Sequence, residues 1–165
     1  MRIYLPATTA ILQRLVDDGE IGRSPLTAFA VTPALREWYS DDDVEALEFA
    51  ALLEAARASL RLVDADPAAR RRRVVIAADV ADAEVTMRDD LDRGVVVLTA
   101  PVRLSAVASA HIDDPDAEPA IAAAAAASLE ADLGHVASQE AVDDAEGFEL
   151  SWYASQEIPV LLDLL

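Results

Sequence analysis

The chain has 165 residues, of which 53% are hydrophobic and 27% charged, and it carries a formal net charge of −18 with no cysteine. This composition is too apolar for a disordered chain and predicts one folded domain spanning residues 1–165. The lack of cysteine excludes disulfides, thiolate nucleophiles and cysteine-based metal sites. No apolar run is long enough for a signal peptide or a membrane-spanning helix, so we expect a cytoplasmic protein without membrane association.

The charge is unevenly distributed along the chain. Residues 104–165 contain thirteen Asp or Glu and no Arg or Lys, whereas residues 1–103 contain eighteen acids and thirteen arginines. Such an asymmetry is expected of a surface that binds a basic partner, or of a surface that only keeps the protein soluble. It disfavours nucleic acid as a partner, because affinity for nucleic acid depends on neutralising phosphates. The use of arginine without lysine, with abundant alanine, is typical of coding by a G+C-rich genome.

The first half of the chain predicts two strands and three helices. Thr8 or Thr9 is a suitable N-cap for the first helix, and Thr32 followed by Pro33 marks the start of a short one. Ser40 and Asp43 resemble a capping box at the start of a long helix. The expected apolar stripe of that helix consists of Phe49, Leu52, Leu53, Ala56, Leu60 and Val63. The predicted elements are a strand at 2–5, a helix ending at 19, a strand at 26–31, a short helix to 39 and a long helix to 63.

The second half predicts several short strands and one alanine-rich helix. The Arg73–Ala78 segment has the continuous apolar run of a strand that is buried on both faces. Pro115 opens the alanine-rich helix, which ends at about Leu133 before Gly134. The other predicted elements are strands at 85–87, 94–99, 109–112 and 148–154, an acidic loop at 135–147 and an apolar tail at 157–165.

This order of elements predicts an α/β (α+β) fold in which a mixed sheet is covered by about three main helices. An arrangement similar to the ferredoxin-like fold with extra strands fits this order. Two alternatives stay open, namely an open parallel sheet and a sheet with helices on one face only. The succession of short strands between residues 73 and 112 argues against a purely parallel sheet, because short connections favour antiparallel neighbours.

Familiar catalytic and metal-binding motifs are absent from the sequence. The five glycines are too scattered for a dinucleotide fingerprint or a P-loop, and no serine stands between two glycines in a nucleophile elbow. Ser109, His111 and Asp113 would lie on one side of a strand without the geometry of a catalytic triad. A calcium loop starting at Asp114 fails at its sixth and twelfth positions. The sequence therefore predicts no cofactor and no dedicated metal site, and it favours a protein that is not an enzyme.

One basic cluster is a candidate anion-binding site. Arg70, Arg71, Arg72 and Arg73 are consecutive and could bind a phosphate or a carboxylate. The alternative, which we prefer, is a solvated entry to the following strand whose charges balance neighbouring acids.

Two identical aromatic dipeptides form the other candidate site. Trp38-Tyr39 and Trp152-Tyr153 hold four of the eight aromatic residues and lie near predicted strand ends, where ligand sites tend to form. If they converge, they line one pocket. Otherwise they seal the core beneath helix starts, which is the reading we prefer. The polar side chains that accompany the dipeptides, with Glu37 or Glu157 as the candidate acid or base, are Arg36, Glu37, Ser155, Gln156 and Glu157.

Nearly the whole chain resembles a family of small acidic actinobacterial proteins known only as a domain of unknown function. The segments that carry the resemblance are YLPATTAILQRLVDDGEI, LTAFAVTPALREWY, EFAALLEAARASLRLV, RRRVVIAADV and SWYASQEIPVLLDLL. The resemblance implies a cytoplasmic, single-domain protein of actinobacterial origin. The family carries no assigned reaction, ligand or catalytic residue, so no site is transferred to this sequence.

Two hypotheses about function follow. The first is a noncatalytic binding or regulatory domain that contacts a protein partner or a second copy of itself through the acidic 104–165 surface or the apolar 158–165 tail. The second is a small enzyme or ligand carrier whose pocket is lined by the two aromatic dipeptides with Gln156 and Glu157. A third reading, in which the acidity only reflects a salty or crowded habitat, requires no binding function.

Overall fold

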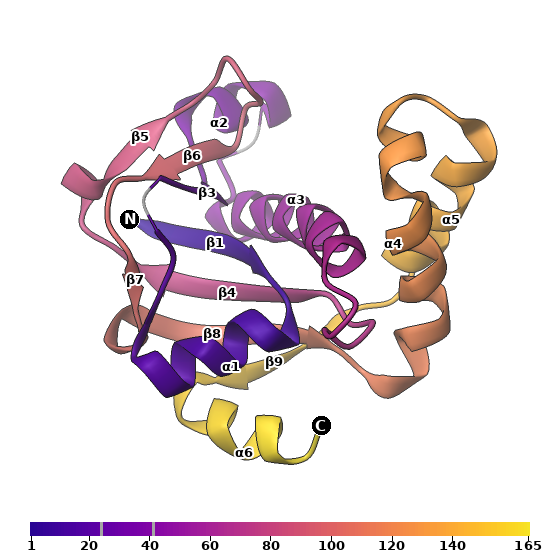
Figure 1. The fold of residues 1–165 in the computed structure, drawn as a ribbon. Coiled ribbons are helices and arrows are strands. Elements are labelled where there is room, and N and C mark those ends of the chain that lie inside the picture. The colour runs from indigo at the N-terminus through magenta and orange to yellow at the C-terminus, as the bar shows by residue number, and fades with distance from the viewer. Residues whose placement is uncertain (24, 41) are drawn as a thin grey trace.

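The computed structural model describes residues 1–23, 25–40 and 42–165 and has the predicted α+β architecture (Figure 1). The candidate capping segment includes Asp41, which lies outside the described residues. The strands are β1 (Arg2–Ala7), β2 (Glu20–Ile21), β3 (Leu26–Phe29), β4 (Val74–Asp79), β5 (Val85–Met87), β6 (Val95–Leu98), β7 (Val102–Arg103), β8 (Val107–Asp113) and β9 (Leu150–Ala154). The helices are α1 (Thr9–Asp18), α2 (Pro33–Tyr39), α3 (Val44–Ala65), α4 (Glu118–Asp132), α5 (Val136–Glu146) and α6 (Ile158–Asp163).

The main sheet has seven strands in the order β5-β6-β3-β1-β4-β8-β9, and β2 pairs with β7 in a small second sheet. Every described pairing in both sheets is antiparallel, so the predicted mixed sheet is wrong. The reason is that β1 lies between β3 and β4. The connection through α3 therefore joins two strands of the same direction that are not neighbours, and the antiparallel β1 fills the gap between them.

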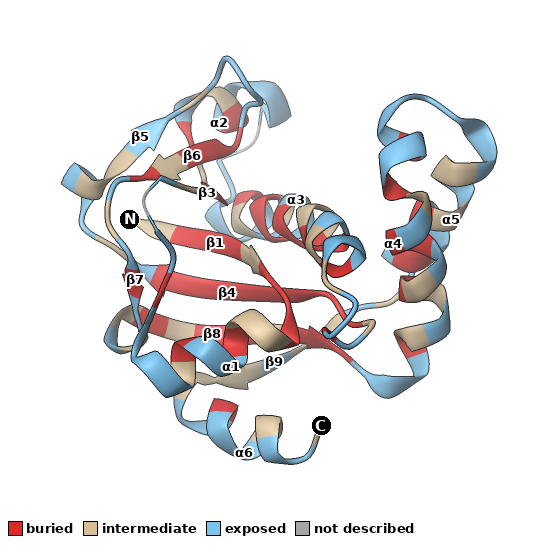
Figure 2. Cartoon of the chain, in the orientation of Figure 1, coloured by how far each residue is buried: buried red, intermediate tan, exposed pale blue. Residues whose placement is uncertain are grey.

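The sheet carries helices on both faces. On one face, α1 and α6 cover a core that includes Leu5, Ile76 and Ile112. On the other face, α3 packs on Tyr4 and Val75. Figure 2 shows the central strands buried between these layers. This alternation follows from the strand pattern, because successive side chains in β1 and β4 point to opposite faces.

The predicted helix starts are confirmed at Thr8 and Thr32. The Thr8 hydroxyl accepts a hydrogen bond from the Ile11 N–H, and the Thr32 hydroxyl accepts one from the Leu35 N–H. The predicted stripe of α3 is wrong at Phe49 and Leu53, which are 56% and 42% exposed. Instead, α3 packs against the sheet and α4 through a face rich in alanine, because small side chains allow α3 to approach both of them closely. The buried residues of α3 are Leu47, Ala51, Leu52, Ala55, Ala56, Ser59, Leu60 and Val63.

The acidic segment 135–147 is not the predicted loop, because most of it is helix α5, which forms a hairpin with α4. The hairpin buries Ala-rich surface together with Val142, Leu60 and Val63. The acids that suggested a loop lie largely on the outer faces of the helix, where they stay hydrated.

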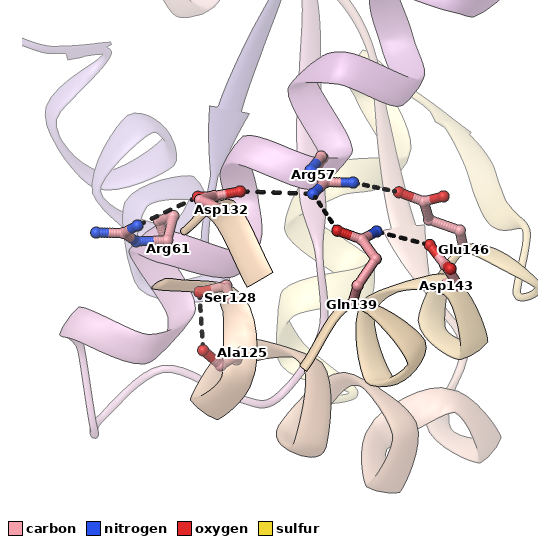
Figure 3. A network of polar contacts seen from close by, with 8 residues as sticks. All are labelled: Arg57, Arg61, Ala125, Ser128, Asp132, Gln139, Asp143 and Glu146. Carbon is pink, nitrogen blue, oxygen red and sulfur yellow. Dashed lines mark hydrogen bonds and ion pairs between the residues drawn. The ribbon is translucent and has the colours of Figure 1, made fainter. Parts of the chain in front are cut away.

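A polar network fixes this hairpin to α3 (Figure 3). The Arg57 guanidinium contacts Asp132, Gln139 and Glu146 at 3.5, 3.3 and 3.3 Å, and Arg61 contacts Asp132 at 3.3 Å. Arg57 and Arg61 therefore neutralise part of the acidic hairpin within the chain itself.

Candidate functional site

The described part of the chain contains an open cleft of about 900 Å³. It lies at the seam between β1 and β3, and it is bounded by α1 on one face of the sheet and by α3 on the other. Its size falls within the range of small-molecule sites, roughly 300–1,000 Å³.

The cleft exists because the two central strands separate. β1 pairs with β4 along all six of its residues, but its described pairing with β3 is limited to Tyr4 and Phe29. Beyond this pair, β1 continues with Leu5 and Pro6. A proline is tolerated in a central strand only where one neighbour does not need its N–H, and the open seam meets this condition.

The walls of the cleft are apolar and its rim is charged. The apolar lining residues are Leu5, Pro6, Ile11, Ile21, Leu26, Phe29, Ala58 and Leu62, and the exposed charged ones are Arg14, Asp18, Glu20 and Arg23. Gly22 lies at the rim with φ +93°, and a Cβ atom there would lie 2.1 Å from Leu26 Cδ1. A glycine at this turn lets Leu26 approach the backbone closely.

Trp38 and Tyr39 border a different and much smaller hollow of about 90 Å³. The Arg93 guanidinium lies over the Trp38 ring, with Cζ 3.4 Å from the ring centroid, which is a cation–π contact. Loss of solvent around the Glu54 carboxylate, with the nearby charge of Asp92, raises the pKa of Glu54. A hollow of this size accommodates a few water molecules rather than a metabolite. Glu37, the predicted acid or base beside it, is exposed on α2.

Trp152 and Tyr153 lie on β9, at the opposite side of the sheet from α2 (Figure 1). The strands β1, β4 and β8 separate β9 from β3, the strand that leads into α2, so the structure does not bring the two dipeptides together. Trp152 is 60% exposed, whereas Tyr153 packs against the core on the α1 side.

The polar residues beside Trp152 have structural partners. Glu157 accepts a hydrogen bond from the Ala154 N–H at 2.8 Å, and the Gln156 side chain contacts Ser155 at 3.4 Å. Both residues are exposed, and neither lines the seam cleft. Glu157 therefore serves as a cap at the start of the last helical segment.

Each of the four arginines at 70–73 contacts a different part of the chain. Arg70 donates to the Leu165 carbonyl, Arg71 to the Val63 and Asp66 carbonyls, and Arg72 to Glu118 at 2.8 Å. Arg73 is buried and forms a two-point ion pair with Asp113. The structure thus disperses the predicted anion-binding cluster, because residues 70–73 lie in the irregular segment before β4 and each side chain has its own partners.

Asp113 is also unavailable to His111. Ser109 Oγ lies 3.3 Å from His111 Nε2, but the Asp113 carboxylate is held by Arg73, so these three residues form no triad. Burial lowers the pKa of His111, and the positive charge of Arg2 adds to this effect.

The lowered pKa of His111 predicts a pH-dependent stability. In the unfolded chain His111 takes up a proton near pH ~6.5, whereas folded His111 takes it up only at a lower pH. The contribution of neutral His111 to the free energy of unfolding is therefore complete above that pH and is lost as the pH falls below it. We expect His111→Gln to lose less stability than the wild type between pH ~7.5 and ~5.5. Urea unfolding at both values measures this difference, and parallel losses in the two proteins would contradict it.

No group of three or more His, Asp or Glu side chains among the described residues is arranged to hold a metal ion. None of the described helices combines the length and apolar character needed to cross a membrane.

Sequence reasoning missed the seam cleft because its lining comes from β1, α1, β2 with the turn after it, β3 and α3. The available signals were Pro6 directly after a predicted strand and Gly22 beside a charged turn. Neither residue indicates by itself that two strands separate.

The model of a family of unknown function, DUF6912, matches residues 1–162. No curated protein matches the chain, and no solved structure does. The match confirms the predicted membership in a domain family of unknown function and covers every element that lines the cleft. The chain therefore belongs to the DUF6912 family, a family of unknown function.

Proposed function

We propose that this protein is a noncatalytic binding domain whose ligand is a small, largely apolar molecule held in the seam cleft. The observation that carries the proposal is a cleft of about 900 Å³ with apolar walls at the centre of the fold. Ligand sites in proteins are typically concave, mostly apolar and bordered by a few polar groups, which is the composition of this cleft.

The chemistry of the lining supports binding rather than catalysis. The described lining holds no His, Ser or Tyr, and its charged groups are exposed at the rim. Nucleophilic catalysis requires a nucleophile held beside a base. Besides the exposed rim carboxylates of Asp18 and Glu20, the described lining offers the Thr27 hydroxyl, which has no hydrogen-bonded base among the described residues.

A substitution that fills the cleft tests the proposal. Leu62 lines the cleft from α3, whereas Leu53 is 42% exposed on α3 and does not line it. We expect decanoate or 1-decanol to raise the melting temperature of the wild type and of Leu53→Trp, because a ligand that binds only the folded state stabilises it. Leu62→Trp should lose the shift while keeping the wild-type circular dichroism. Failure of both probes to stabilise the wild type would contradict the proposal.

A protein contact at β9 is the second candidate function. The outer edge of β9 pairs with no described strand, and Trp152 on this strand is 60% exposed. An open edge with an exposed tryptophan favours contact with another chain, either a partner or a second copy. Sedimentation of the wild type and of Trp152→Ser tests self-association: a mass above one chain that Trp152→Ser abolishes supports it, and a monomer at all concentrations contradicts it.

We also propose that the protein acts as a single domain in the cytoplasm of an actinobacterium. The use of arginine without lysine and the abundance of alanine support this source, because both are typical of coding by a G+C-rich genome. The lack of cysteine fits a reducing compartment.

A further inference from the structure

We propose that the ligand of the seam cleft is an anionic amphipathic molecule, with its carboxylate or similar group at Arg14 and Arg23 and its apolar body between the strands. This inference rests on the proposed binding function and specifies the charge of the ligand. The observation that carries it is which arginines in the described part of the chain have a partner there and which do not.

Most arginines are already neutralised or engaged. Nine of the thirteen contact a carboxylate, an amide or carbonyl oxygen, or an aromatic ring. Among the described residues, the four without such a partner are Arg14, Arg23, Arg36 and Arg103. Two of these four line the seam cleft.

An unpaired arginine is informative in this protein because acids are abundant. The chain has 31 Asp and Glu against thirteen arginines, so carboxylates outnumber guanidinium groups more than twofold. Two guanidinium groups that stay unpaired at one apolar cleft are therefore available for an external anion. Guanidinium groups bind carboxylates and phosphates well through paired N–H donors.

The order of residues along α1 gives the ligand an orientation. Ile11, Arg14 and Asp18 are spaced by three and four residues, so they follow one another along one face of the helix, and all three line the cleft. The apolar body lies at the level of Ile11, and the anionic group lies one turn further at Arg14. Asp18 follows after another turn, about 6 Å along the axis.

The negative charges of Asp18 and Glu20 repel an anion, so the proposal predicts opposite effects on affinity for the removal of an arginine and of a carboxylate. Both carboxylates line the same cleft. Removing a rim arginine should weaken the binding of an anion, whereas removing a rim carboxylate should strengthen it. Neither change should affect a neutral ligand with the same apolar chain.

The experiment compares decanoate with 1-decanol by isothermal titration at low ionic strength. We expect Arg14→Gln and Arg23→Gln each to weaken decanoate binding about two- to fivefold, and the double variant roughly tenfold. Asp18→Asn should strengthen it. Arg36→Gln is the matched control, because it removes an arginine that is also exposed and unpaired but lies outside the cleft, and it changes the net charge equally.

The outcomes separate this inference from the proposed function. Selective loss of decanoate binding in the Arg14 and Arg23 variants, with 1-decanol unchanged, supports the anionic ligand. If Arg36→Gln weakens decanoate as much as Arg14→Gln does, or if both probes bind all variants equally, the anionic ligand is overturned while the cleft remains a binding site. If neither probe binds the wild type, both proposals fail. Circular dichroism verifies that each variant is folded.

Discussion

Replacing Asp113 with alanine is expected to lower the free energy of unfolding by about 3–5 kcal/mol, because it leaves the Arg73 guanidinium buried without a counter-charge. The two side chains are 2% and 0% exposed. Asp113 accepts hydrogen bonds from Arg73 Nε at 2.9 Å, Arg73 Nη2 at 2.8 Å and the Arg73 backbone N–H at 2.7 Å. Arg73 also donates to the Phe148 carbonyl at 2.8 Å. Urea unfolding followed by circular dichroism measures the loss.

The pair Arg2–Asp79 is the matched control for this prediction. It has the same two-point geometry, with distances of 2.8 and 3.0 Å, but its side chains are 37% and 60% exposed. Asp79→Ala should cost about 1 kcal/mol or less. The double variant Arg73→Met/Asp113→Leu should regain much of the stability that Asp113→Ala loses, because no charge is then left buried. Equal losses for Asp113→Ala and Asp79→Ala would contradict the assigned role.

Ser59→Ala is expected to have the second-largest effect. The Ser59 hydroxyl is fully buried, donates to the Ala7 carbonyl at 2.7 Å and accepts from the Val74 N–H at 3.1 Å. It thereby ties α3 to the end of β1 and the start of β4. Alanine removes both bonds, and each buried group left without a partner costs about 1–3 kcal/mol. Urea unfolding measures the total, and hydrogen exchange should show a less protected Val74 amide.

Ser128→Ala is the control for Ser59→Ala. Ser128 is also buried, but its hydroxyl donates to the Ala125 carbonyl within the same helix at 2.9 Å (Figure 3). Alanine is a better helix former than serine, and the Ala125 carbonyl still lies within the same helix when the hydroxyl is removed. The free energy of unfolding should therefore change little or rise slightly. A loss from Ser59→Ala no larger than that from Ser128→Ala would show that the Ser59 bridge does not stabilise the fold.

The parts of the fold that sequence predicted well are those decided by local physics. Thr8 and Thr32 cap helices through their own hydroxyls, and the apolar run of β4 requires burial wherever the strand lies. The failures depended on distant partners. Phe49 is exposed because α3 packs through its alanines, and most of residues 135–147 form a helix because Val142 and Ala145 pack against apolar residues of α4 and α3.

The candidate sites were harder to predict than the fold for the same reason. Trp38 and Trp152 belong to similar dipeptides, but the strand order that separates them is set by pairings that local sequence does not specify. The arginines at 70–73 are adjacent in sequence, which predicts one cluster, yet their partners range from Val63 to Leu165. The cleft itself results from a limited pairing of β1 with β3, which no single residue indicates.

The most direct test of the seam cleft as the binding site is a titration of ¹⁵N-labelled protein with decanoate, followed by amide chemical shifts. We expect saturable shifts that are largest at cleft residues such as Ile11, Leu26 and Leu62, and small shifts at Trp38 and Trp152. The absence of saturable shifts, or a shift pattern centred on β9 or α2, would contradict the assignment of the cleft.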